Sequence, residues 1–229
     1  MISIVVPAYN EEENILNCVY EINKAMIPIK EDWELIVVDD GSKDKTVLRL
    51  NKLKIRFTNL IVLSNGKNIG PGAAFRNGFK AAKGDKIVTI DSDLSYSPEK
   101  IPLLLNQLEE NDIAIGSWNK GNARLINISL SRTIVSKVAH FLDKTILRVN
   151  LSSLSSFFCA YKSNVIKNIE FEANGFDAQC EIITKIYKKG YKIKEVPVDL
   201  IWSSDRRKNS KLKLMKEIKN RILLWRRLN

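Results

Sequence analysis

The sequence predicts an α/β fold in which helices cover both faces of a mostly parallel central sheet. Along the first half of the 229-residue chain, short apolar segments alternate with segments of helical periodicity. Each apolar segment is a continuous run, which is typical of strands buried on both faces of a parallel sheet. No Gly-x-Gly-x-x-Gly pattern follows the first run, so the dinucleotide-binding version of this architecture is not favoured.

The first half of the chain contains five expected strands and the helices between them. The strands are expected at residues 2–7, 34–38, 60–63, 86–90 and 113–116. Helices are expected at residues 11–26, in a short segment after the second strand, and at residues 73–82 and 98–110. At the first helix, Asn10 is placed to act as the N-cap, and Glu11, Glu12 and Glu13 favour the positive end of the helix dipole.

The second half of the chain has a looser pattern. We expect a loop at 117–127, a helix at 128–147, a strand at 152–161, a helix at 177–188 and a strand at 191–198. A basic helix is expected at 210–228, where apolar side chains recur near one face. The apolar stripe of this last helix is imperfect because Lys219 and Arg226 interrupt it.

The composition favours a soluble protein of the cytoplasm. Hydrophobic residues make up 45% and charged residues 28% of the chain, as in ordinary globular domains. No apolar run approaches the roughly 18 residues that span a bilayer, and no signal peptide is recognisable. Cys18, Cys159 and Cys180 are scattered without metal-ligand spacing, which favours reduced thiols. Because His140 is the only histidine, a zinc site or a histidine-based triad is disfavoured.

Positive charge is concentrated at the C-terminal end. The net charge is +11, and residues 203–229 hold ten Lys or Arg against two acids, a local balance of +8. Such a segment favours an anionic partner, namely phosphate, nucleic acid or an acidic membrane surface. Nucleic acid is the weakest of these, since Trp202 and Trp225 are the only nearby aromatic residues and no recognised module is present.

Polar and acidic side chains follow three of the expected strands. They are Tyr9, Asn10 and Glu11 after the first strand, Asp39 and Asp40 after the second, and Asp91, Ser92 and Asp93 after the fourth. Because the carboxyl ends of parallel strands meet at one edge, these segments are expected to converge there. Two carboxylates one residue apart suit Mg²⁺ or Mn²⁺ held together with substrate phosphates. A solvated turn that happens to contain two aspartates would have the same sequence pattern.

Four motifs in a fixed order resemble the family 2 glycosyltransferases, whose catalytic domain has the GT-A fold. The motifs are Val6-Pro7-Ala8-Tyr9-Asn10-Glu11, Val37-Val38-Asp39-Asp40-Gly41-Ser42, Asn68-Ile69-Gly70-Pro71-Gly72-Ala73 and Asp91-Ser92-Asp93-Leu94. Later motifs resemble the polyprenyl-phosphate branch of that family. These are Ser95-Tyr96-Ser97-Pro98, Ser131-Arg132 with Ser136, Glu195-Val196-Pro197 and Ser210-Lys211-Leu212.

The resemblance implies a domain organisation and a set of site residues. It implies one GT-A domain at 1–205, with a donor-nucleotide half at 1–120 and an acceptor half at 121–205, followed by a basic amphipathic helix at 206–229. Asp91 and Asp93 would bind the metal and, with Arg132 and Lys211, form the catalytic set. The implied nucleotide-binding residues are Pro7, Tyr9, Asn10, Glu11, Asp39, Asp40, Gly70 and Ser92.

The implied activity is a metal-dependent, inverting sugar transfer. The donor would be a GDP- or UDP-linked sugar, with mannose or glucose expected, and the acceptor a polyprenyl phosphate such as dolichyl phosphate. A lipid phosphate is already anionic at neutral pH, so it needs cations such as Arg132 and Lys211 rather than a strong general base. Such a protein would be peripheral on the cytoplasmic face of a membrane, reached through an anionic membrane surface or a membrane-embedded partner.

Two other hypotheses remain open from the sequence. One is a family 2 transferase acting on a glycan or another hydroxyl acceptor, for which Glu181 is the candidate base. The other is a degenerate homologue acting as a binding or regulatory subunit. Both are kept because the acceptor side departs from the branch pattern at Trp118, Ser153 and Asp205, so the identities of the sugar and acceptor stay open.

Overall fold

A computed structural model describes residues 1–202 and 211–228 and contains a seven-stranded sheet of order β3-β2-β1-β4-β7-β5-β8. Neighbouring strands are parallel, except that β7 runs antiparallel to both β4 and β5. The mostly parallel sheet predicted from the sequence is therefore confirmed. The strands are β1 (Ile2–Ala8), β2 (Trp33–Asp39), β3 (Leu60–Ser64), β4 (Lys86–Thr89), β5 (Ile113–Ser117), β7 (Cys159–Lys162) and β8 (Ile193–Pro197).

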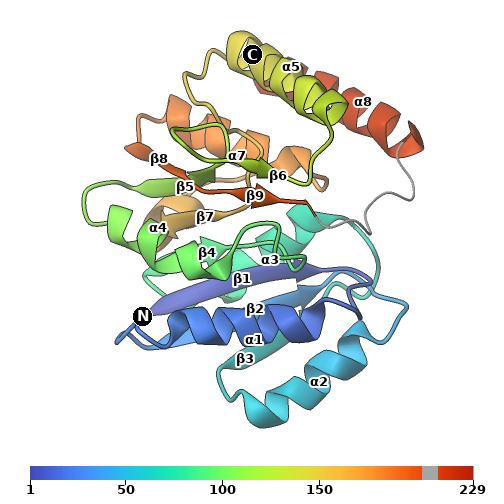
Figure 1. Ribbon diagram of the computed structural model, residues 1–229, viewed down its shortest axis with the longest axis vertical. Helices are drawn as coiled ribbons and strands as arrows, with labels where there is room; N and C mark the ends of the chain where they lie inside the picture. Colours follow the sequence, from blue (N-terminus) through green and yellow to red (C-terminus); the bar gives the residue numbers. More distant parts are fainter. Residues whose placement is uncertain (203–210, 229) are drawn as a thin grey trace.

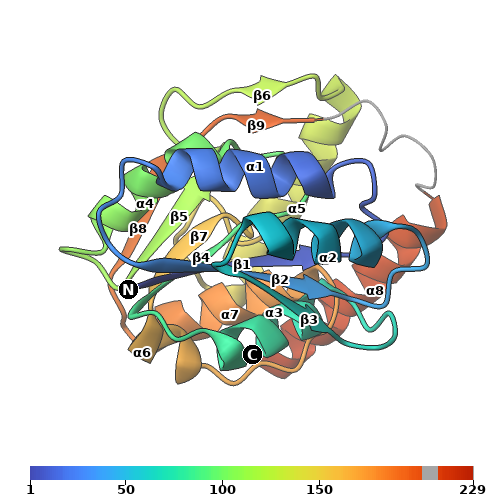
Figure 2. The same cartoon turned by 90° about the horizontal axis from the view of Figure 1, so that it is seen from below.

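Helices cover both faces of this sheet (Figures 1 and 2). On one face lie α1 (Ile15–Met26), α2 (Thr46–Arg56) and α4 (Ile101–Gln107), which follows the 3₁₀ turn η1 (Pro98–Lys100). On the other lie α3 (Pro71–Ala81), α6 (Ser163–Lys167), α7 (Asp177–Lys188) and the end of α8 (Lys211–Leu228). The remaining helix, α5 (Leu130–Leu147), lies next to α8 at the end of the molecule farthest from α2 (Figure 1).

The alternating strand side chains explain why the strands are continuous apolar runs. In β1, Ile4 and Val6 belong to the core beneath α1, α2 and α4, whereas Val5 belongs to the core beneath α3 and α7. All three side chains are 0% exposed. Burial on both faces therefore favours an apolar residue at every position of the strand.

The structure corrects the sequence-based boundaries in the second half of the chain. Only residues 159–161 of the expected strand at 152–161 belong to the paired strand β7, because the preceding apolar side chains pack in the core without joining the sheet. The expected loop at 117–127 contains β6 (Leu125–Ile126), which pairs in parallel with β9 (Leu200–Ile201). Helix α6 was not expected. Strand β7 of the expected acceptor half lies between β4 and β5 of the expected donor half, so both halves share one sheet.

The first helix begins later than the sequence pattern predicts, and Asn10 does not cap it. Helix α1 begins at Ile15, after Asn14, and its first turn contains no acidic residue. Asn10 has a φ of 54°, in the left-handed region that Asn tolerates better than most residues. Its side-chain oxygen accepts a hydrogen bond from the backbone N–H of Lys43 at 2.8 Å. Asn10 therefore joins the loop after β1 to the loop after β2.

The described part of the C-terminal helix packs on the domain. The Asp143 carboxylate of α5 is 0% exposed and accepts hydrogen bonds from the Arg221 guanidinium and from Trp225 Nε1, the latter at 2.9 Å. Leu224 is 1% exposed and belongs to the core beneath α3 and α7. Within the described residues, no helix is both long enough and apolar enough to cross a membrane.

Candidate nucleotide and metal site

The three polar segments singled out in the sequence lie at neighbouring strand ends. Strand β1 lies between β2 and β4 in the sheet, and all three strands run in the same direction. Their carboxyl ends therefore form one continuous edge of the sheet. Tyr9, Asp39 and Asp91 each lie at or just after the end of one of these strands. The predicted convergence of these segments is confirmed.

A cavity of about 570 Å³ opens beside the carboxyl end of β2. Asp39, only 2% exposed, contributes a carboxylate to its wall, and Tyr9, 40% exposed, contributes an aromatic ring. The volume lies within the usual range for small-molecule sites. The lining residues are Tyr9, Asp39, Gly41, Ser42, Lys43, Val47, Ser64, Gly66, Lys67 and Asn68.

The turn after β2 fixes the Asp39 carboxylate at the cavity. Its oxygens accept hydrogen bonds from the backbone N–H groups of Gly41 and Ser42, both at 3.1 Å. Gly41 has a φ of +77°, and a Cβ on it would lie 2.6 Å from the Cα of Lys67. Glycine is therefore required where this turn approaches the loop after β3. The carboxylate is held rigidly, with acceptor capacity left for a ligand N–H or hydroxyl group.

Asp40 has a different role from its neighbour. The carboxylate is 3% exposed and accepts from the Asn65 side chain at 2.7 Å and from the backbone N–H groups of Ile69, at 3.1 Å, and Gly70, at 2.7 Å. These contacts fix the loop after β3, which supplies part of the cavity wall. Asp40 and Gly70, both expected at the nucleotide, thus shape the loop and are not among the residues that line the cavity.

The remaining residues of the first motif join the two loops at this edge. The backbone N–H of Asn10 donates to Ser42 Oγ at 2.9 Å, and that of Glu11 donates to Thr46 Oγ1 at 2.8 Å. The Glu11 carboxylate accepts from the Asn14 side chain at 2.8 Å. Pro7 is buried within β1. Of the first motif, only Tyr9 therefore lines the cavity.

The paired carboxylates of Asp91 and Asp93 follow β4. One oxygen of Asp93 accepts from both the backbone N–H and the hydroxyl of Ser95, at 2.9 and 2.7 Å. Leu94 has a φ of 53°, a left-handed conformation that is unusual for a branched residue and is found most often at functional sites. Ser92, between the two acids, is 5% exposed and faces the interior.

The negative charge of Asp91 acts on neighbouring titratable groups. Burial, with a smaller contribution from the negative charge of Asp91, raises the pKa of Cys159 to about 12. Burial also raises the pKa of Tyr96, and Asp91 again adds to the effect. Carboxylate oxygens are the ligands that Mg²⁺ and Mn²⁺ prefer. No cluster of three or more ligand side chains occurs among the described residues, so the phosphates of a substrate and water would complete the coordination of such an ion.

The two acceptor-side cations expected from the sequence belong to helices α5 and α8. Helix α5 begins at Leu130, so Arg132 lies in its first turn, and α8 begins at Lys211. The side chains of Arg132 and Lys211 lie outside the part of the chain that the structure describes, as does all of Asp205. Their roles at an acceptor phosphate stay predictions.

Two other acceptor-side departures from the family pattern lie inside the domain. Trp118 is 9% exposed, and its ring meets that of His140 edge to face with centroids 6.2 Å apart. Ser153 is 1% exposed. Their burial indicates that these two departures alter packing rather than an open surface.

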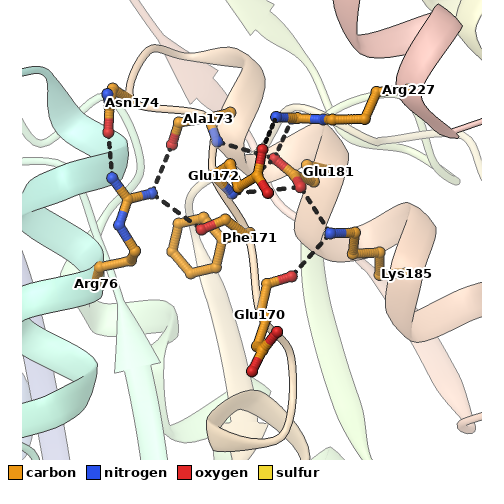
Figure 3. Close-up of polar contacts among 9 residues, drawn as sticks. All are labelled: Arg76, Glu170, Phe171, Glu172, Ala173, Asn174, Glu181, Lys185 and Arg227. Carbon is orange, nitrogen blue, oxygen red and sulfur yellow. Dashed lines mark hydrogen bonds and ion pairs between the residues drawn. The ribbon is translucent and has the colours of Figure 1, made fainter.

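Glu181, the candidate base for a hydroxyl acceptor, is instead a buried anchor (Figure 3). It is 0% exposed and accepts from the backbone N–H groups of Glu172, at 3.2 Å, and Ala173, at 3.0 Å. It also forms ion pairs with Lys185 of α7, at 2.8 Å, and with Arg227 of α8. A base needs a lone pair directed at the substrate. The Glu181 oxygens are directed at these four donors, so the geometry does not support a role as base.

The same segment, whose contacts with Arg76 of α3 are drawn in Figure 3, explains the Gly-Pro-Gly motif at the start of α3. Arg76 of α3 donates to the carbonyl of Ala173 at 2.9 Å, and the N–H of Gly72 donates to the carbonyl of Asn174 at 2.8 Å. Gly70 has a φ of +126°, and a Cβ on it would lie 2.2 Å from that same carbonyl oxygen. The motif therefore serves a close backbone approach between segments far apart in the sequence.

Two lysines at this site were not predicted from the sequence. Lys43 and Lys67 both line the cavity, from the loops after β2 and β3. Their signal is their position: each is a basic residue shortly after an apolar strand whose carboxyl end lies at the ligand-binding edge.

Comparisons with known proteins agree with this geometry. The model of the family described as glycosyl transferase family 2 matches residues 3–170. A dolichol-phosphate mannosyltransferase of Pyrococcus furiosus is 33% identical over 200 residues, covering 86% of this chain and 55% of that protein. A dodecaprenyl-phosphate galacturonate synthase of Rhizobium johnstonii is 33% identical over 172 residues, covering 74% of this chain and 50% of that protein. The chain thus spans about half the length of these relatives.

A solved structure supports the fold. Glucosyl-3-phosphoglycerate synthase of Mycobacterium tuberculosis, crystallised with Mn²⁺ and uridine-diphosphate-glucose, superposes with a TM-score of 0.71 at 22% identity. The match covers 97% of this chain and 76% of that one.

The mostly parallel sheet flanked by helices and the match to this solved structure identify the fold as GT-A. The chain belongs to glycosyl transferase family 2. The resemblance to the polyprenyl-phosphate transferases of that family, inferred from the motifs, is confirmed by the two relatives.

Proposed function

We propose that this protein is a metal-dependent, inverting glycosyltransferase that moves a sugar from a nucleotide donor to a polyprenyl phosphate. The observation that carries the proposal is the order of groups along one edge of the sheet. A cavity with a fixed carboxylate and an aromatic ring lies at the end of β2, and two metal-type carboxylates follow β4, one strand beyond β1. A nucleotide in the cavity would direct its phosphates along this edge toward Asp91 and Asp93.

The cavity residues suit a nucleoside. The ring of Tyr9 offers a surface for a base or ribose, and Asp39 offers a fixed acceptor for a ligand N–H or hydroxyl group. Lys43 and Lys67 offer donors to carbonyl or phosphate oxygens. This part of the site would bind and orient the donor without taking part in bond breaking.

Asp91 and Asp93 would hold the donor pyrophosphate through a divalent cation. Such an ion, when bound, stabilises the charge that develops on the departing nucleoside diphosphate. Ser95 keeps the Asp93 carboxylate in one orientation through its two hydrogen bonds. This preorganisation means that the carboxylate need not reorient during the reaction.

A lipid phosphate is the acceptor that the site supports best. Both relatives are named for polyprenyl-phosphate acceptors, and the burial of Glu181 removes the candidate base that a hydroxyl acceptor would require. A phosphate monoester oxygen is already a nucleophile at neutral pH. Its attack on the anomeric carbon, opposite the nucleotide, would invert that carbon. Arg132 and Lys211 remain the proposed cations for this phosphate.

A donor screen tests the proposal. The protein is incubated with GDP- or UDP-linked mannose or glucose, with Mn²⁺ or Mg²⁺, and with a short polyprenyl phosphate, a soluble glycan or no acceptor. We expect mass spectrometry to find a lipid phosphosugar with at least one donor. Product on the glycan alone would favour the hydroxyl-acceptor hypothesis. Neither transfer nor donor hydrolysis would favour a binding subunit and contradict the proposal.

Calorimetry with the nucleoside diphosphate tests the donor cavity alone. We expect Asp39→Ala to weaken binding about tenfold or more, because the cavity loses a charged acceptor worth about 1.5 kcal/mol or more. The matched control is Asp32→Ala, at an exposed position before β2. If both variants bind like the wild type, the Asp39 carboxylate only stabilises the turn after β2 and does not bind the nucleotide.

A further inference from the structure

Helix α5 has an apolar face that points away from the domain. Five large apolar side chains on it are between 40% and 68% exposed. Their spacing of i, i+1, i+4, i+7 and i+8 places them on one side of the helix. They are Ile134, Val135, Val138, Phe141 and Leu142.

The opposite side of α5 holds the helix on the domain. Asp143 and Leu147 are 0% exposed and His140 is 7% exposed. Asp143 is bound to α8, and His140 Nε2 accepts from the backbone N–H of Leu154 at 3.3 Å. The helix is therefore fixed in orientation. Within the described residues, nothing covers its apolar face.

The exposed charges on α5 are positive. Lys137 and Lys144 are exposed beside the apolar face. Lys137 directly precedes Val138, and Lys144 lies two positions after Leu142. The one acid of the helix, Asp143, is buried in its ion pair with Arg221. An exposed apolar face with cations along one flank, on a helix whose single acid is buried, matches a surface with a hydrocarbon interior and anionic headgroups.

Helix α8, which is bound to α5 through Asp143, also exposes apolar and basic side chains. Ile222 and Leu223 are 40% and 51% exposed, and Lys219 and Arg226 are also exposed. Figure 1 shows α5 and α8 side by side at one end of the molecule, and the contact of Asp143 with Arg221 confirms their proximity.

We propose that the outward face of α5, together with the exposed side chains of α8, binds the surface of an anionic bilayer. The inference rests on the proposed function, because a lipid acceptor has its phosphate in the headgroup layer. Two large apolar residues of α8 are not available to lipid, because Trp225 donates to Asp143 and Leu224 lies in the core. The apolar contact with the bilayer is therefore made mainly by α5. This is the same helix that contains Arg132 in its first turn.

Flotation with vesicles of phosphatidylcholine and phosphatidylglycerol in equal parts tests this inference. The variant is Ile134→Ser, Val138→Ser and Phe141→Ser together. We expect the wild type to float with the vesicles at low salt and the triple variant to bind about tenfold more weakly or worse, because it has lost apolar area that the lipid would bury.

A matched control comes from the far end of the molecule. Ile27, Leu48 and Ile55 are exposed at 79%, 54% and 87%, at the end of α1 and on α2. Replacing these three with Ser removes a similar apolar area and should leave flotation unchanged. Circular dichroism and thermal melting should show all variants folded, since every replaced side chain is largely exposed.

Three results would overturn the inference. They are a wild type that does not float, a triple variant that floats like the wild type, and a control that loses flotation to the same degree. A concentration-dependent dimer in sedimentation that only the α5 variant abolishes, with no flotation, would assign the face to a second copy of the chain. The vesicles contain no polyprenyl phosphate and no donor, so the outcome is independent of whether the proposed transfer occurs.

Discussion

Asp40→Asn should destabilise the protein through the loop after β3. The aspartate is 3% exposed, and its carboxylate accepts from Asn65 and from the N–H groups of Ile69 and Gly70. An amide of the same shape must present an NH₂ group to some of these donors. Hydrogen bonds to a charged group are worth about 1.5–3 kcal/mol each, so the loss of two at the lower value costs about 3 kcal/mol.

The assays are urea and thermal denaturation together with nucleotide calorimetry. For a chain of this size, about 3 kcal/mol corresponds to a fall in melting temperature of roughly 6–12 °C. Nucleoside diphosphate affinity should fall too, because the loop supplies Gly66, Lys67 and Asn68 to the cavity. The control is Asp32→Asn, at an exposed position. A change in unfolding free energy below about 0.5 kcal/mol would refute the role assigned to Asp40.

Three further predictions concern stability. Gly70→Ala should cost about 2 kcal/mol or more, since the new Cβ meets a backbone carbonyl at a φ of +126°; an unchanged urea midpoint would show that the backbone relaxes freely. Arg221→Glu should lower the free energy of unfolding by about 3 kcal/mol or more, because it leaves Asp143 buried beside a like charge. The control Lys219→Glu, at an exposed position, should be near neutral. Equal effects of the two variants would contradict the buried ion pair. Burial and the charge of Arg221 lower the pKa of His140 below 6.5, so the unfolded chain binds more protons than the folded chain. The free energy of unfolding should therefore fall as pH drops below about 6.5. The slope of this dependence on pH should be smaller in His140→Gln.

The sheet could be predicted from the sequence because strands that are buried on both faces consist mainly of apolar residues. Strands β1 and β2 consist mainly of apolar residues, and polar residues of the site lie at or just after the ends of β1, β2 and β4. The segment before β7 gave a misleading signal, since Leu154 and Phe157 are apolar for packing rather than for strand pairing. The two-residue strands β6 and β9 are too short to give any periodic signal.

The site could be predicted as a set of segments but not as individual roles. Asp39 and Asp40 are adjacent and chemically identical, yet one lines the cavity and the other fixes a loop, because successive side chains leave a strand end in different directions. The anchor role of Glu181 depends on donors from Glu172, Lys185 and Arg227 (Figure 3). That long-range arrangement leaves no pattern in the local sequence.

The most direct test of the proposed activity is the rate of sugar transfer to polyprenyl phosphate as Mn²⁺ or Mg²⁺ is titrated, in the wild type and in Asp91→Asn and Asp93→Asn. We predict a metal-dependent wild-type rate and a loss of about a hundredfold or more in each variant, which corresponds to about 3 kcal/mol of transition-state stabilisation. Each variant should keep the wild-type circular dichroism spectrum. A wild type that transfers sugar at its full rate in excess EDTA, or variants that match it, would contradict the metal role of these two carboxylates.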